Sequence, residues 1–179
     1  ALYWLDNTNK TIMRAALDGS GRVDLFAAPN PDDISGMNYL TDLKIDDQGN
    51  RLYWSGGGGI HAVDATGANR SQVANLGYLS QAVAVDREYD AVYYAAGYGT
   101  IVRTRLDGSD ARTLVSGLGA WVTDIAVDRV HNRLYWTLYV NGSAWRVQRA
   151  DLNGANIETI LTRPGMATGL ALDVAGDKL

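Results

Sequence analysis

The amino-acid sequence predicts an all-β protein that is assembled from four copies of one repeat. Three short patterns recur together along the chain: an apolar-Tyr-aromatic triplet, a turn glycine, and an alternating apolar run that ends in aspartate. The sequence has no sustained 3.6-residue periodicity, which an amphipathic helix would show. Of its 20 acidic residues only Glu88 and Glu158 are glutamate, and the excess of Asp favours turns over helices.

The triplet marks one strand in each repeat, because aliphatic and aromatic residues favour a half-buried strand. Its copies are Leu2-Tyr3-Trp4, Leu52-Tyr53-Trp54, Val92-Tyr93-Tyr94 and Leu134-Tyr135-Trp136. The glycine marks a tight turn, since Gly accepts backbone conformations that other residues avoid. Its copies are Leu17-Asp18-Gly19, Ala65-Thr66-Gly67, Leu106-Asp107-Gly108 and Leu152-Asn153-Gly154, and they step by 48, 41 and 46 residues.

The alternating run predicts a further strand, and its last residue steps by 40, 42 and 45 residues. The four copies are Leu43-Lys44-Ile45-Asp46, Val83-Ala84-Val85-Asp86, Ile125-Ala126-Val127-Asp128 and Leu170-Ala171-Leu172-Asp173. The repeated Asp could form a ring of carboxylates for a metal ion. We interpret it instead as a cap that accepts backbone N–H bonds from the following turn, since all four copies share it.

A unit of about 40–45 residues with room for four short strands has the length of a β-propeller blade. We therefore predict a propeller of four-stranded antiparallel blades, with residues 1–179 forming a single array of four blades. The consensus Tyr-Trp, then Ile-x-Arg-x-x-Leu-Asp-Gly, then Ile-Ala-Val-Asp resembles the YWTD repeats of the LDL-receptor class B family. The Asp of the name-giving tetrapeptide is present only as Asp6, whereas the other repeats read Ser55-Gly56, Ala95-Ala96 and Thr137-Leu138.

The resemblance implies that the alternating run is the innermost strand of a blade and the Tyr-Trp run is the next one out. The run from Leu170 to Asp173 would then complete the blade that Leu2-Tyr3-Trp4 begins, so one blade is split between the two ends. Propellers of this type usually close with six blades, which leaves three arrangements: a four-bladed monomer, a homodimer that closes an eight-bladed ring, or part of a longer array. We favour the homodimer, because symmetric closure pairs both open sheet edges.

Composition excludes several classes of partner. The net charge of −4 with scattered Lys and Arg predicts no nucleic-acid ligand. No run of eighteen apolar residues occurs, so we expect no membrane insertion. The chain opens at Ala1 on a strand-like run without a signal peptide, as expected of a mature or trimmed product. The compartment stays open, with an extracellular or secreted location slightly favoured.

The sequence predicts no catalytic residue, cofactor or metal site. His61 and His131 occupy different repeat positions, and we interpret both as surface residues rather than a paired site. Propeller lactonases typically hold a divalent metal ion in the channel with Glu and Asn or Asp ligands, yet neither Glu lies near an innermost strand. The run Gly56 to Gly59 lacks the Lys and helix of a phosphate loop and predicts a tight hairpin.

The candidate ligand site lies seven residues before each terminal Asp, where every copy is large and apolar: Tyr39, Leu79, Trp121 and Met166, with Tyr78 beside Leu79. YWTD propellers bind protein ligands on this face, so the resemblance implies an anchoring patch at the channel mouth. The alternative is that these residues seal the joints between blades. Lys44 is added to these candidate ligand residues because the other three repeats have alanine at its position. It either reaches into the channel or marks an irregular blade.

An arginine also recurs two positions after an apolar residue of the strand expected third in each blade. Its copies are Arg14, Arg103 and Arg149. We expect its stem to cover a neighbouring aromatic ring and its head to bind a turn carboxylate. The lectin-like alternative is a sugar or phosphate site in each blade.

These observations favour a non-enzymatic binding scaffold with a protein or glycan partner at the channel mouth. A propeller lactonase or hydrolase with a divalent metal ion in the channel is the alternative function. A second alternative is an assembly module without a ligand, either a natural or an engineered half-propeller.

Overall fold

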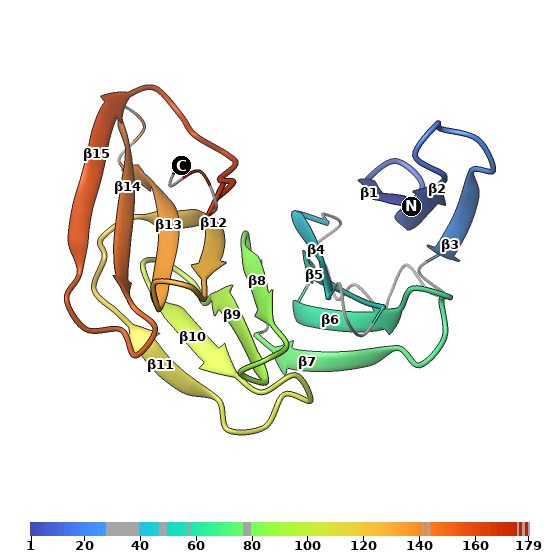
Figure 1. Cartoon of the computed structure of the whole chain (residues 1–179), viewed down its shortest axis with the longest axis horizontal. Helices are drawn as coiled ribbons and strands as arrows, with labels where there is room; N and C mark the ends of the chain where they lie inside the picture. Colours follow the sequence, from blue (N-terminus) through green and yellow to red (C-terminus); the bar gives the residue numbers. More distant parts are fainter. Residues whose placement is uncertain are drawn as a thin grey trace. The chain divides into compact units, whose positions relative to one another are not determined.

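The computed structural model describes residues 1–27, 40–46, 50–56, 58–76, 80–140, 142, 144–174, 176 and 178. Within these residues every regular element is a β-strand, and the strands form four antiparallel sheets (Figure 1). The chain falls into two compact units, Ala1–Ser80 and Gln81–Leu179, each of which contains two of the sheets. The predicted all-β class is confirmed.

The first unit begins with a three-stranded sheet and continues with a four-stranded one. The first sheet has the order β1 (Leu2–Asp6), β2 (Thr11–Ala15) and β3 (Val23–Ala27). The second sheet has the order β4 (Asp42–Asp46), β5 (Arg51–Gly56), β6 (Gly59–Asp64) and β7 (Ser71–Asn75). Gly56 pairs with Gly59 across the β5–β6 hairpin, which confirms the tight turn predicted there.

The second unit holds two four-stranded sheets. The third sheet of the chain comprises β8 (Val83–Asp86), β9 (Ala91–Ala95), β10 (Ile101–Thr104) and β11 (Arg112–Val115). The fourth comprises β12 (Trp121–Asp128), β13 (Arg133–Val140), β14 (Ala144–Asp151) and β15 (Glu158–Pro164). In each sheet the strands follow one another in chain order, so each repeat folds locally into its own sheet.

The aromatic triplets lie where the repeat predicts, on β1, β5, β9 and β13. Both faces of such a strand are covered in the second and third sheets. Tyr53 and Trp54 are 1% and 3% exposed, and so are Tyr93 and Tyr94. The strand therefore consists of large apolar residues in succession rather than alternating polar and apolar ones.

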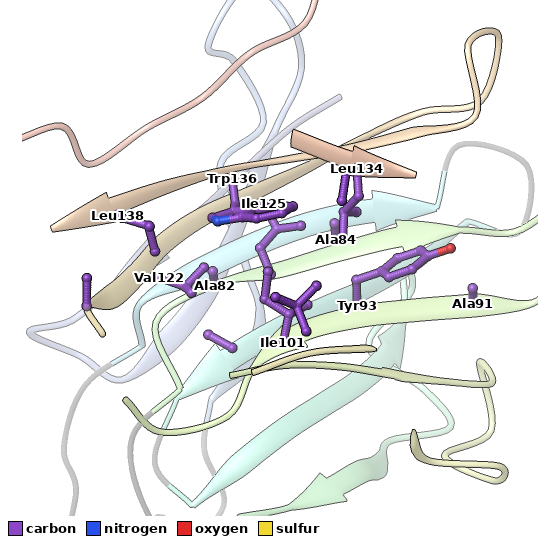
Figure 2. Packing of buried hydrophobic residues seen from close by; sticks show 14 residues of the cluster. Ala82, Ala84, Ala91, Tyr93, Ile101, Val122, Ile125, Leu134, Trp136 and Leu138 are labelled. Atoms are coloured by element: carbon purple, nitrogen blue, oxygen red, sulfur yellow. The ribbon is translucent and has the colours of Figure 1, made fainter. Parts of the chain in front are cut away.

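Neighbouring sheets within each unit join through apolar clusters to which the aromatic strands contribute. In the first unit Ile12 of β2 packs with Trp54 and Leu52 of β5, and Tyr3 and Leu5 flank them. In the second unit a larger cluster joins the third and fourth sheets. Figure 2 shows Trp136 and Ile125 of the fourth sheet packed near Ala84 and Ile101 of the third. Removal of this apolar surface from water is the main stabilising contribution to each joint.

The turn glycine is required for two physical reasons. Gly67 and Gly154 have φ of +88° and +84°, which costs other residues conformational energy. A Cβ atom on Gly67 would also lie 2.5 Å from the carbonyl oxygen of Leu25, and one on Gly154 would overlap with that of Leu114. The glycine thus lets each turn approach the outer strand of the preceding sheet.

The strand-ending aspartates cap the turns that follow them, as predicted. Asp86 accepts a hydrogen bond from the backbone N–H of Tyr89 (3.3 Å), and Asp128 accepts one from that of His131 (3.1 Å). Asp173 accepts one from Gly176 at 2.9 Å. Most of the turn after Asp46 lies outside the described residues. The carboxylates therefore satisfy local backbone donors in three repeats.

His61 is wrongly predicted as a surface residue, since it is 7% exposed and stacks on Trp54 with ring centroids 5.3 Å apart. The cause is register, because Trp54 and His61 are direct partners in the β5–β6 pair. His131 is exposed.

Residues 170–172 lie in no strand, and Asp173 pairs with Lys178 in an isolated bridge, so the split blade stays a prediction.

Candidate aromatic binding site

The fourth sheet departs from the other three in the length of its strands. Strands β12, β13 and β14 have eight residues each and β15 has seven, whereas the strands of the other sheets have four to six. The β13–β14 hairpin stays paired as far as Val140 and Ala144. The repeat needs none of this additional length to form a sheet. The extension is therefore a feature particular to one copy.

The extension carries a line of aromatic side chains across the sheet. Trp121 pairs with Tyr139, Tyr139 pairs with Trp145, and Trp145 pairs with Arg163. Directly paired residues on neighbouring strands project from the same face of a sheet. We call these four residues the aromatic row. Trp121 is 40% exposed, Tyr139 and Trp145 are half-buried, and Arg163 is exposed.

A second exposed ring lies against the start of the row. Tyr98, in the turn between β9 and β10, contacts Trp121 edge to face with ring centroids 5.3 Å apart. Its hydroxyl donates a hydrogen bond to the carbonyl of Gly119 at 2.6 Å. The backbone N–H of Leu118 donates to the carbonyl of Gly99 at 3.1 Å, which joins the turn to the segment before β12. These bonds hold Tyr98 and Trp121 in fixed positions.

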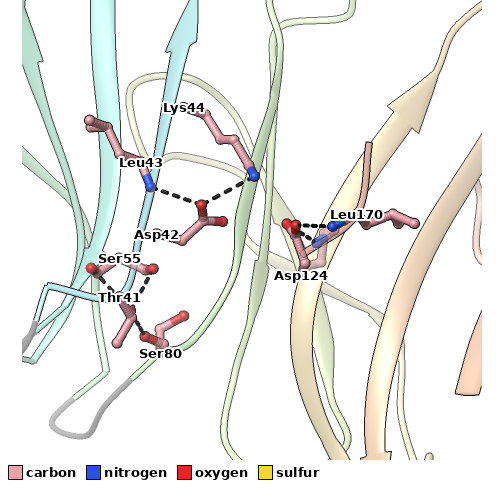
Figure 3. Close-up of polar contacts among 9 residues, drawn as sticks. Thr41, Asp42, Leu43, Lys44, Ser55, Ser80, Asp124 and Leu170 are labelled. Atoms are coloured by element: carbon pink, nitrogen blue, oxygen red, sulfur yellow. Dashed lines mark hydrogen bonds and ion pairs between the residues drawn. The ribbon is translucent and has the colours of Figure 1, made fainter. Parts of the chain in front are cut away.

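Polar contacts at the start of β12 anchor the segment that follows β15. The Thr123 hydroxyl lies 2.8 Å from that of Thr137 and donates to the carbonyl of Ala167 at 3.1 Å. The Asp124 carboxylate accepts the backbone N–H of Leu170 at 2.7 Å (Figure 3). The start of β4 repeats this pattern in the first unit, where the Thr41 hydroxyl donates to the carbonyl of Ser80 (Figure 3). The threonine of the Thr-Asp dipeptide therefore anchors a following segment in both sheets.

The predicted ligand residues fall into three groups. Tyr39, Tyr78 and Leu79 lie outside the described residues. Trp121 and Met166 are both exposed, Met166 by 61%, and the bond from Thr123 to Ala167 brings the segment that carries Met166 to the start of β12. Lys44 on β4 forms an ion pair with Asp42, with its Nζ atom 3.1 Å from the Asp42 Oδ1 atom. A ligand-binding role for these residues stays a prediction.

Sequence reasoning missed Tyr98, Tyr139 and Trp145. The spacing of the turn glycines did not reveal them, since the step of 46 residues into the last repeat is shorter than the first step of 48. Tyr139 and Trp145 lie symmetrically about Gly142 in the β13–β14 turn. Tyr98 has no counterpart in that pattern, because its place beside Trp121 depends on the packing of two sheets.

The repeated arginines lie opposite the first aromatic residue of the triplet. Arg14 pairs with Tyr3, Arg103 with Tyr93 and Arg149 with Tyr135. Their positions beside an aromatic ring agree with the expectation. The predicted carboxylate partner is found for Arg149, whose Nε atom donates to Glu158 on β15 at 3.0 Å. This partner lies on a strand rather than in a turn.

The ionisable groups of the second unit include one carboxylate–imidazole pair. The Nδ1 atom of His131 lies 2.7 Å from the Asp128 carboxylate. Burial acts to raise the pKa of Asp128, but the hydrogen bonds from the ring and backbone of His131 outweigh it, and the pKa lies below its usual value. Among the described residues no group of three or more His, Asp or Glu side chains is placed to hold a metal ion. No helix in this part of the chain has the length and apolar character needed to cross a bilayer.

Over 151 residues the chain is 30% identical to the human low-density lipoprotein receptor-related protein 5-like protein, covering 75% of this chain and 53% of that protein. The fold is similar to a chain of the nidogen/laminin complex, with a TM-score of 0.73 at 17% identity, covering 88% of this chain and 59% of that chain. The chain carries YWTD-type propeller repeats. The resemblance and the fold class predicted from the sequence are thereby confirmed.

The YWTD-type chain spans about half the length of its human relative. No family model matches it. Its fold is also similar to that of a gluconolactonase from Xanthomonas campestris, with a TM-score of 0.56 at 20% identity, covering 73% of this chain and 42% of that chain. This second likeness concerns the fold alone.

Proposed function

We propose that this YWTD-type chain is a non-enzymatic binding module whose aromatic row anchors a protein partner. The observation that carries the proposal is the position of the row. It lies on the strands of the fourth sheet, which are longer than the corresponding strands of the other sheets. Features shared by all four repeats serve the fold, whereas the extension adds Tyr139 and Trp145 beside Trp121 without completing a repeat feature.

The composition of the row supports a protein partner. Trp, Tyr and Arg are the residue types most enriched among interface residues that dominate binding energy. Three strand spacings of about 4.8 Å give the row a length of roughly 14 Å, comparable to four or five residues of an extended peptide. A paired sheet also holds the rings in place before binding, which lowers the entropy lost on association. One structure of similar fold comes from a complex of two proteins, nidogen and laminin.

The test uses a random-peptide library displayed on phage, selected against the wild-type chain and against Trp121→Ala. Peptides enriched on the wild type should bind Trp121→Ala and Trp145→Ala at least about tenfold more weakly, as expected when one hot-spot residue is lost. Ile157→Ala is the matched control, because Ile157 is an exposed apolar residue of the same unit outside the row. It should bind the same peptides unchanged.

Two results would overturn the proposal. Peptides that bind Trp121→Ala as well as the wild type would show that the row is not the anchor. Binding to a glycan array that is lost in Trp121→Ala, with no peptide enriched, would assign the row to a glycan, the other partner that the repeats suggest. Thermal unfolding of each variant by circular dichroism separates these outcomes from loss of the fold.

The enzymatic alternative is a lactonase or hydrolase with a divalent metal ion. Its support is the fold-level likeness to the gluconolactonase. Elemental analysis of protein purified without chelator tests it, since a stoichiometric, tightly bound divalent ion would favour this alternative over the binding module.

We further propose that a second copy of the chain covers the outer face of the first sheet and closes an eight-bladed ring. Trp54 and Trp136 are at most 3% exposed, whereas Trp4 at the same repeat position is 36% exposed and Leu2 beside it 45%. A Cβ on Gly19 would meet no atom within 4 Å, unlike one on Gly67. This face therefore has the residues of a packed joint, and the described residues of the first unit do not cover it.

Light scattering after size-exclusion chromatography tests the assembly. A mass near twice the 19.3 kDa of one chain, reduced to that of one chain by Trp4→Glu, supports the ring. A wild-type mass of one chain would refute it.

We also propose an extracellular or secreted location, on the strength of the likeness to a lipoprotein receptor-related protein.

A further inference from the structure

A cationic pocket lies between the third and fourth sheets, away from the residues of the aromatic row. Its volume is about 390 Å³, within the range of small-molecule sites. The residues that line it are Tyr89, Tyr93, Arg103, Arg112, Thr113, Leu114, Asn132, Leu152 and Asn153. They include two arginines and no carboxylate, so the described lining has a net positive charge.

The two arginines face each other in an arrangement that the other sheets avoid. Arg103 on β10 and Arg112 on β11 are direct cross-strand partners. Like charges in this position destabilise a sheet. In the fourth sheet the equivalent pair is Arg149 with Glu158, whose Nη2 and Oε2 atoms lie 2.9 Å apart. The third sheet thus has a second cation where the fourth has the balancing anion.

Arg103 is held in position by the protein itself. Its Nη2 atom donates to the carbonyl of Tyr89 at 2.9 Å, and its guanidinium also donates to the Tyr93 hydroxyl. Burial raises the pKa of Tyr93, against the opposing effect of the bond from Arg103, so the hydroxyl keeps its proton. Figure 2 shows this hydroxyl at the end of the ring that points away from Ala82 and Val122.

Arg112 differs from Arg103 because its side chain is exposed and, within the described part of the chain, makes no hydrogen bond or ion pair. The charge of the Asp86 carboxylate acts on Tyr93, which makes Asp86 one candidate partner for Arg112. The Asp86 side chain is 1% exposed, lies 3.8 Å from Arg129, and does not line the pocket. It therefore does not supply the missing partner of Arg112.

We propose that this pocket binds a small organic molecule through a tetrahedral oxyanion, a phosphoryl or sulfuryl group, held between Arg103 and Arg112. A guanidinium forms two parallel hydrogen bonds to such a group, and two guanidinium groups can together engage its three terminal oxygens, whereas one suffices for the two oxygens of a carboxylate. The Tyr93 hydroxyl accepts from Arg103 and can donate its proton to the anion. Leu114 and Leu152 provide apolar walls for the rest of the molecule.

Isothermal titration calorimetry with inorganic phosphate and with sulfate, at constant ionic strength set by chloride, tests the proposal. The wild type should bind one anion saturably, and the tighter of the two identifies the group. Arg112→Ala should weaken binding at least tenfold, and Arg112→Glu, which restores the Arg–Glu pair of the fourth sheet, should abolish it. Arg112→Lys keeps the charge without the planar fork and should bind with intermediate affinity.

Arg105→Ala is the control. Arg105 directly follows β10, is exposed and does not line the pocket, so its replacement removes the same charge close to the site. It should leave binding unchanged. Equal binding by the wild type and Arg112→Glu, or equal weakening by Arg105→Ala and Arg112→Ala, would refute the site and indicate non-specific attraction. Since Arg112 is exposed, its variants keep the fold, and circular dichroism confirms this. The outcome is independent of the peptide selection on the aromatic row.

Discussion

Replacement of Trp136 by alanine tests how the second unit is held together. Trp136 is fully buried in the cluster that joins the third and fourth sheets, and its indole N–H donates to Gln148 at 3.1 Å. Loss of a buried Trp side chain costs about 3–5 kcal/mol of unfolding free energy. The lost hydrogen bond adds little, because Gln148 is only partly buried and water can replace the donor.

Urea unfolding followed by far-UV circular dichroism measures this loss. With a slope of about 2 kcal/mol per molar urea, a loss of 4 kcal/mol lowers the midpoint by about 2 M. Trp121→Ala is the comparison, since a residue that is 40% exposed and makes one edge-to-face contact should lose about 1–2 kcal/mol. If the two variants lose the same free energy, or Trp136→Ala loses under about 1.5 kcal/mol, the buried joint does not dominate stability and the reasoning fails.

Two further substitutions test the repeat. Gly154→Ala should lose clearly more unfolding free energy than Gly19→Ala. Both positions have positive φ, which costs an alanine about 1–2 kcal/mol, but only a Cβ atom on residue 154 would overlap with the Leu114 carbonyl. Equal losses of unfolding free energy in urea would refute the packing role of Gly154. Asp128 has a pKa below the 3.8 of an unfolded Asp, so it stabilises the fold above pH 3.8 and loses this effect as pH falls through its folded pKa. Asp128→Asn should therefore flatten the acid side of the stability profile, and an unchanged slope below pH 4 would contradict the bond to His131.

Much of the fold follows from local rules that act within a few residues. The triplets, the alternating runs and the positive φ at Gly67 and Gly154 depend on strand periodicity and on the backbone freedom of glycine. The capping by Asp86 and Asp128 is equally local, since each accepts a bond from an N–H three residues ahead. The sequence patterns behind these features occur four times in the chain, and repetition is what separates them from chance.

The candidate sites depend on contacts between residues far apart in sequence. Sequence reasoning selected Trp121, but Tyr139, Trp145 and Arg163 join it only through the registers of three strand pairs. His61 was misassigned for the same reason, because its partner Trp54 is set by the β5–β6 register. A shift of one residue in register moves every side chain of a strand to the opposite face.

The sequence by itself determined the repeat, its strands and its turns, because these follow from backbone sterics and the two-residue period of a strand. Only the tertiary structure decided which aromatic rings line up across the fourth sheet and which arginine lacks an acid. The residue opposite Arg149 is Glu158, and the residue opposite Arg103 is Arg112. Nothing in the spacing of the repeat distinguishes these pairs, since hydrogen-bonded register and sheet packing place them.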